Sequence, residues 1–224
     1  MSRLLEPPSP NCRLPCWWGF TPGKSNWESA AILLRSFSEV ELLGYLRDGE
    51  IYEVIIPALQ AKGLYSHHFY ATRANLIESI EVPDPGDAPD FTIKALLAEF
   101  GQPDQIWLRT YSKPYLNKLP FGLALFYPAR GVVAAYYGDA RLQQDEVVIC
   151  LGQVSHPYLG MWDSRQAWDF EQAALRFNWD TASWAFLELE KSTGVSIDEL
   201  TNAVQTESKD YCLKTPAINW QPAQ

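Results

Sequence analysis

The chain has 224 residues, of which 47% are hydrophobic and 20% charged, so it can bury a sizeable core and is not of low complexity. Its formal net charge of −9 argues against binding a nucleic-acid backbone, which needs a basic surface. No apolar run approaches the roughly 20 residues of a membrane-spanning helix, since the best one, 119–127, contains Pro120 and Gly122.

Residues 1–24 are predicted to form an extended arm, and a helix is expected to begin directly after it. Ser25 and Glu28 have the spacing of a capping box, which satisfies backbone amides of a helix's first turn. Apolar residues follow at helical spacing: Trp27, Ala30, Ala31 and Leu34. This stripe predicts that one face of the helix is buried.

Antiparallel strands are expected after this helix. They span 39–46, 51–59, 66–70 and 76–82. The segment 73–75 is predicted to be a turn, because Asn75 tolerates a positive φ. Residues 83–89, rich in proline and aspartate, form the clearest break in the chain. The first α+β half is therefore assigned to 25–83.

The second half, 90–152, follows the same order. A helix over 91–100 is predicted to stop at Gly101. The strands expected after it span 105–111, 123–127, 132–137 and 146–151. Segment 69–77 aligns with 126–133, each a strand, a turn that carries an arginine, and a second strand. An internal duplication explains this economically, and a chance likeness between hairpins is the alternative.

From Ser164 onward the sequence is predicted to be mostly helical. The expected helices span 169–178, 181–192 and 196–205, followed by an extended tail. Residues 164–224 would then form a helical cap and tail. The predicted fold class is thus α+β: two helix-plus-antiparallel-meander repeats followed by a C-terminal helical cap, together one compact unit.

Four cysteines bear on the compartment: Cys12, Cys16, Cys150 and Cys212. A disulfide between Cys12 and Cys16 would close a tight loop in the proline-rich arm, and one between Cys150 and Cys212 would link the end of a strand to the tail. Four reduced thiols are the alternative, and a metal site is a third. Residues 1–16 hold no apolar signal region, so we expect either a cytoplasmic protein or an exported one whose targeting segment is not part of this chain.

Two segments resemble a known family. Residues 11–23, which contain Leu-Pro-Cys-Trp-Trp-Gly, resemble the N-terminal motif of uncharacterised bacterial extracytoplasmic, lipoprotein-like proteins, and 212–220 resembles their closing signature. The resemblance implies export and strengthens the disulfide interpretation, but it implies no known activity. Each half is also weakly similar to outer-membrane assembly lipoproteins of the SmpA/OmlA type and to β-lactamase-inhibitor-like modules, which act by protein contact.

No catalytic or metal-binding arrangement is identified. Cys16 and the histidines have no context that brings them together, and His67 and His68, adjacent on a strand, point to opposite faces. Neither a Walker A motif nor G-x-G-x-x-G occurs, so no cofactor is expected.

Aromatic residues and turn arginines are the binding candidates. Trp17 and Trp18 are adjacent on the arm and are expected to face opposite ways, so that one packs in the core and the other stays partly exposed. Arg73 and Arg130 occupy matching turns, where loops often carry function.

The predicted function is that of a non-enzymatic extracytoplasmic protein that binds another protein or an envelope component. One alternative is an envelope-glycan hydrolase that uses an unidentified carboxylate pair. Another is binding of a small molecule between the two halves. A cytoplasmic location remains the alternative compartment, and the oligomeric state is open.

Overall fold

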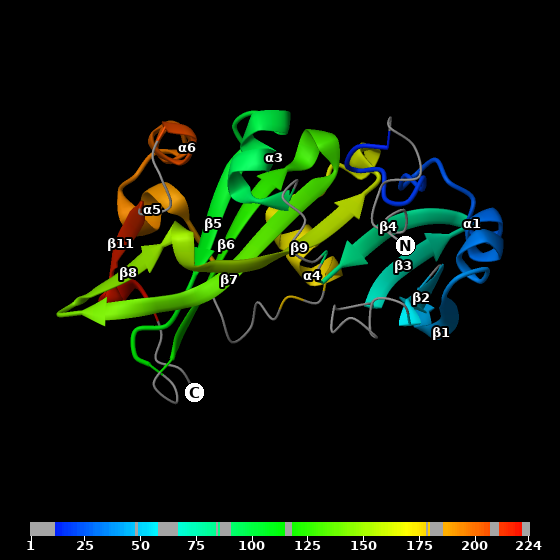
Figure 1. The fold of residues 1–224 in the computed structure, drawn as a ribbon, viewed down its shortest axis with the longest axis horizontal. Coiled ribbons are helices and arrows are strands. Elements are labelled where there is room, and N and C mark those ends of the chain that lie inside the picture. Colours follow the sequence, from blue (N-terminus) through cyan, green and yellow to red (C-terminus); the bar gives the residue numbers. More distant parts are fainter. Residues whose placement is uncertain are drawn as a thin grey trace. The chain divides into compact units, whose positions relative to one another are not determined.

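The computed structural model describes residues 12–47, 49–57, 67–83, 85, 91–114, 118–177, 179, 186–206 and 211–220. Eleven strands in antiparallel pairing are the predominant elements of the described chain, and its α-helices have only 5 to 10 residues (Figure 1). The prediction of α+β repeats under a helical cap is therefore wrong, because strands outnumber the short helices, and two strands, β10 (Leu187–Glu188) and β11 (Cys212–Pro216), lie within the region assigned to the cap.

The chain divides into two compact units whose boundaries differ from the predicted ones. Unit 1 comprises 1–86, 128–133 and 158–173, and unit 2 comprises 87–127, 134–157 and 174–224. Each unit is thus built from segments that are distant in the sequence.

Unit 1 contains one helix and an antiparallel meander. Its elements are α1 (Trp27–Leu34), β1 (Glu39–Leu46), β2 (Gly49–Ile55), β3 (His67–Arg73), β4 (Leu76–Val82) and the end of β9 (Val154–Trp162). They pair in the order β1-β2-β3-β4-β9. The predicted turn before Leu76 is confirmed: Ala74 and Asn75 have φ of 48° and 62°, as a two-residue hairpin loop with a primed turn requires.

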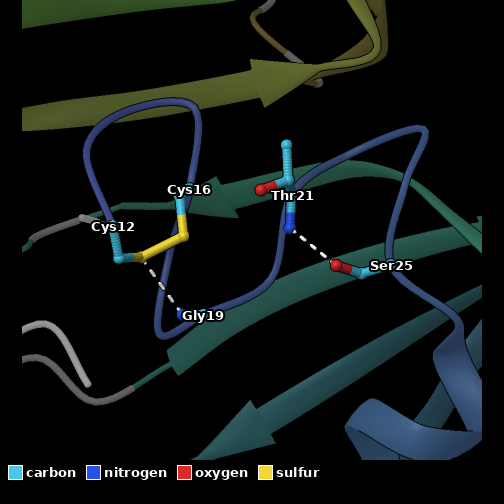
Figure 2. The surroundings of a disulfide bond; sticks show 5 residues. All are labelled: Cys12, Cys16, Gly19, Thr21 and Ser25. Carbon is cyan, nitrogen blue, oxygen red and sulfur yellow. Dashed lines mark hydrogen bonds between the residues drawn. A yellow bond between two sulfur atoms is a disulfide. The ribbon is translucent and has the colours of Figure 1, made fainter. Parts of the chain in front are cut away.

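The helix α1 forms as its apolar stripe predicts. All four stripe residues are buried: Trp27, Ala30, Ala31 and Leu34. The predicted capping box is wrong, because Asn26 is the N-cap and its side chain accepts a hydrogen bond from the Ser29 amide at 3.0 Å. The Ser25 hydroxyl instead accepts from the Thr21 amide at 2.8 Å (Figure 2).

Unit 2 combines a second meander with the C-terminal region. Its elements are α3 (Ile93–Phe100), β5 (Gln105–Arg109), β6 (Leu119–Tyr127), most of β7 (Val132–Gln143), β8 (Glu146–Cys150), β10 (Leu187–Glu188), α5 (Leu189–Thr193), α6 (Ile197–Thr206) and β11 (Cys212–Pro216). Strand order is β10-β5-β6-β7, while β8 pairs with the end of β7 and with β11. Helix α4 (Phe170–Arg176) spans the boundary between the units in sequence.

The second meander does not repeat the first. In unit 1 the four strands after the helix pair consecutively, whereas β8 meets β7 over only three residue pairs and continues on β11. Hairpin β3–β4 has a two-residue loop, but β6 and β7 are joined by the 3-10 helix η3 (Pro128–Arg130) and Gly131. The aligned segments therefore share a sequence pattern without sharing a turn.

The predicted helical cap contains strands. Within 181–192, residues up to 185 lie outside the described chain, Leu187 and Glu188 form β10, and α5 begins at Leu189. Strand β9 was not predicted, because its buried residues Tyr158, Leu159, Met161 and Trp162 show no alternation with polar ones. A strand buried on both faces lacks the period of two that reveals a half-buried strand.

Candidate functional site

All four cysteines are oxidised in the predicted pairs. Cys12 and Cys16 are joined near the N-terminus, and Cys150 is joined to Cys212 across strands β8 and β11. The alternatives of reduced thiols and of a cysteine metal site are thereby excluded. Two disulfides are consistent with an oxidising, extracytoplasmic compartment, because cytosolic thiols are normally kept reduced.

The disulfide of the arm closes a compact loop (Figure 2). Inside it, the Cys16 amide donates to the Arg13 carbonyl at 2.8 Å. The Gly19 amide lies 3.2 Å from the Sγ of Cys12, so the disulfide also contacts the turn that follows it. The described part of the arm is thus folded back on itself rather than extended.

That turn carries the two tryptophans. The Trp17 amide donates to the Phe20 carbonyl at 2.8 Å, and the Phe20 amide donates to the Trp17 carbonyl at 2.9 Å. Trp18 and Gly19 are therefore the two central residues of a tight turn. Both have positive φ, 51° and 86°. Glycine adopts this conformation freely, but for a tryptophan it is unusual and holds only where surrounding contacts enforce it.

These contacts form an aromatic cluster on strand β3. The Trp17 and Trp18 rings stack with centroids 6.0 Å apart, and both meet His68, at 5.6 and 4.6 Å. The Trp17 indole N–H donates to Nδ1 of His68 at 3.4 Å, and Trp18 also packs against Phe37. As predicted, Trp17 is buried and Trp18 is half-buried, but the two rings stack instead of facing opposite ways.

The two arginines of the binding prediction have different surroundings. Arg73, 57% exposed, forms an ion pair at 3.3 Å with Glu78, which is 6% exposed and also accepts a hydrogen bond from Gln166 at 3.0 Å. Glu78 is thus a buried carboxylate held by two side chains, although its sequence context gives no sign of burial. Arg130 ends the 3-10 helix η3 and is exposed. As ligand-binding residues, both stay predictions.

A second ion pair fastens the arm to the segment after β9. Arg165 bonds to both carboxylate oxygens of Asp163, at 2.9 and 2.7 Å, and to the Gly23 carbonyl at 2.9 Å. The hydrogen bond from the Arg165 guanidinium lowers the pKa of the Asp163 carboxyl. A Cβ on Gly23 would lie 2.3 Å from the Asp163 carboxyl carbon, so this close approach requires glycine.

Strand β1 carries an exposed apolar surface that the sequence analysis did not single out. Leu42, Leu43 and Tyr45 are 45%, 58% and 75% exposed, although the strand belongs to a well-packed unit. We call these three residues the β1 apolar surface. A signal was present in the sequence, since the adjacent leucines break the alternation of a half-buried strand. In the structure Leu43 is the extra residue of a β-bulge between Leu42 and Gly44.

An open pocket of about 470 Å³ adjoins this surface. It lies between the β1–β2 and β3–β4 turns, and its lining includes Tyr45, Arg47, Glu50 and Asn75, with Trp27. The Tyr52 hydroxyl donates to Glu50 at 2.5 Å, and this bond raises the pKa of the Tyr52 phenol. A carboxylate, a guanidinium and aromatic rings together offer contacts to a small polar molecule.

Within the described ranges, no group of three or more His, Cys, Asp and Glu side chains is placed to hold a metal ion. None of the helices described is both long and apolar enough to cross a membrane. Comparisons with protein-family models, curated proteins and solved structures found no match for this chain. The resemblance to extracytoplasmic lipoprotein-like proteins therefore stays a prediction.

Proposed function

We propose that this chain is a non-enzymatic extracytoplasmic protein that binds another protein or an envelope component. The two disulfides support the compartment. The observation that carries the binding function is the β1 apolar surface, three large exposed side chains within four residues of one strand.

Exposed apolar side chains that gather on one strand differ from those scattered singly over a surface. Isolated ones need no explanation, whereas adjacent ones on a strand promote association unless a partner covers them. Tyr45 adds a rigid ring with a polar hydroxyl, a combination enriched in protein interfaces. These properties favour recognition of a protein over catalysis.

Photo-crosslinking in the cells that naturally make the protein tests this proposal. A benzoylphenylalanine replaces Leu43 on β1 in one variant and Ile218, which is 92% exposed in unit 2, in a matched control. We expect an adduct of defined mass from position 43 and none from position 218, in a fraction where all four cysteines resist alkylation without reductant. No adduct from position 43, equal adducts from both positions, or alkylated thiols would overturn the proposal.

Binding of a small molecule is a second candidate function, favoured by the pocket beside Glu50. This pocket lies within unit 1, so it differs from the predicted site between the two halves. Glu50→Gln and Arg47→Gln variants would each weaken binding of a polar ligand found by thermal-shift screening, while Asp139→Asn in unit 2 would leave it unchanged. The hydrolase alternative stays a prediction.

A further inference from the structure

Strand β1 is the first strand of unit 1 and pairs on one side with β2. No other described strand pairs with its outer side. The free N–H and C=O groups of such an edge are a template for an added strand. At about 3.3 Å per residue, the eight residues of Glu39–Leu46 offer room for an extended peptide of about seven residues.

One face of this edge is acidic. Exposed Glu39 and Glu41 lie two residues apart, so their side chains share a face of the sheet. The register places Glu41 directly opposite Glu53, and continues this row through Phe69 on β3 to Glu81 on β4. Because Glu39 and Glu41 are both exposed, positive charges on the free side of β1 would be favoured opposite them.

The other face of the same edge is apolar. Val40 and Leu42 alternate with the two glutamates, and their partners on β2 are Val54 and Tyr52. The exposed Leu43 and Tyr45 follow at and beyond the bulge. An added strand would therefore meet acidic residues on one face and apolar residues on the other.

We propose that β1 binds an extended segment of a partner protein as an added strand in which basic residues alternate with apolar ones. The basic residues pair with Glu39 and Glu41, and the apolar residues cover Val40 and Leu42. This inference rests on the proposed function and names the class of partner. A second copy of the chain fits less well, because each copy has a net charge of −9, and an anionic lipid surface would be repelled by the same glutamates.

The alternation can be tested directly with synthetic peptides. The probes are fluorescein-labelled, acetylated heptapeptides: one alternates valine with lysine, one alternates valine with glutamate, and one carries the valines and lysines in separate blocks. Fluorescence anisotropy with the full, oxidised chain measures their affinities. We expect the alternating lysine peptide to bind about tenfold more tightly than either of the others, and its affinity to fall with added salt.

A charge reversal separates this site from general attraction to an acidic protein. Glu41→Lys is expected to weaken the alternating lysine peptide about tenfold and to strengthen the glutamate peptide. Asp139→Lys, which makes the same charge change at an exposed position on β7, serves as the control and should leave both affinities within about twofold. Amide hydrogen exchange should slow in 39–46 when the lysine peptide binds, and not in β8.

Equal binding of the alternating and block lysine peptides, equal effects of the two charge reversals, or protection away from β1 would each overturn the inference. The photo-crosslinking experiment distinguishes this failure from that of the proposed function. A specific adduct from position 43, combined with peptides that do not bind β1, would leave a binding protein that recognises a different chemistry. Absence of an adduct from position 43 would overturn both the proposed function and this inference.

Discussion

The two units differ in how β8 and β1 are covered. In unit 2, β8 is covered by β11 over five residue pairs, and Cys150 lies opposite Cys212, to which it is covalently joined. Strand β11 is fixed in turn, since the buried Thr215 hydroxyl donates to the Ser192 carbonyl at 2.7 Å. In unit 1, β1 keeps an exposed apolar surface and a free outer side among the described residues.

An open side alone does not distinguish β1, since β10 and β11 also pair with only one described strand each; the difference is the large apolar side chains that β1 exposes. Sheet edges are an aggregation hazard, and proteins usually cover them or place lysine or proline on them. In unit 2 the C-terminal strand β11 covers β8, and β11, itself paired with one described strand only, carries Lys214 and Pro216. On β1 the only such devices are two exposed glutamates and a bulge, and under the proposal above the two glutamates select a basic strand.

Removal of the disulfide between β8 and β11 should cost more stability than removal of the disulfide of the arm. The double variant Cys150→Ala, Cys212→Ala opens a link across 62 residues, which corresponds to about 4 kcal/mol on the chain-entropy model. Cys12→Ala with Cys16→Ala opens a link across only 4 residues, worth about 2 kcal/mol on the same model. Urea unfolding of both variants measures the difference, and a larger loss from the arm variant would contradict it.

A leucine-to-alanine pair compares the covered and open strands directly. Leu213 on β11 is 1% exposed, so Leu213→Ala should lower the free energy of unfolding by about 2–5 kcal/mol through lost packing and a cavity. Leu43→Ala, on the open strand, should change it by less than about 0.5 kcal/mol. A comparable loss at both positions would mean that Leu43 is packed against part of the chain.

The buried tyrosines Tyr70 in unit 1 and Tyr136 in unit 2 differ in whether their hydroxyl groups are hydrogen-bonded. Burial raises the pKa of both phenols, so both hydroxyls stay protonated. The Tyr136 hydroxyl in unit 2 donates to the Phe91 carbonyl at 2.9 Å, whereas that of Tyr70 in unit 1 has no hydrogen-bond partner among the described residues. Tyr136→Phe should cost about 1 kcal/mol of unfolding free energy, and Tyr70→Phe should be neutral or stabilising. Thermal unfolding of both variants checks the sign.

The smallest effect concerns the arm of unit 1. Because the pKa of Asp163 is lowered in the folded protein, its contribution to stability is complete above its unfolded pKa of about 3.9 and is lost as the pH falls through the folded value. Asp163→Asn should therefore make unfolding stability depend less steeply on pH below about pH 4. Urea midpoints across the acid range measure this, and parallel curves for the two proteins would contradict it.

Local sequence patterns predicted the parts of the fold that depend on nearby residues. The stripe of α1, the helix before Gly101 and the turn at Ala74–Asn75 formed as expected, because helical spacing and positive-φ preferences act over a few residues. The fold class was wrong because β9 shows no alternation and β10 has only two residues, so neither was predicted as a strand. They become strands through pairing with distant partners, as Leu187 does with Leu108.

The candidate site shows the same limit. The sequence pointed to Trp17 and Trp18 and to the different exposure of their rings. It gave no sign that both rings would contact His68, about 50 residues further along the chain. Nor could it foresee that Glu78 would be buried between Arg73 and Gln166. Side-chain contacts between distant segments depend on register, and one residue of slippage would reverse every face.

The sequence by itself determined the charge, the positions of several helices and hairpins, and four cysteines spaced for two disulfides. Only the tertiary structure decided which strand edge is covered and which is open, since that depends on where the chain's last described strand pairs. It placed Leu213 against Ile149 on β8 and left Leu43 in solvent, although both are leucines in strands. Residue type alone does not tell the buried Leu213 from the exposed Leu43. The two differ because β11 pairs with a distant strand, whereas no described strand pairs with the outer side of β1.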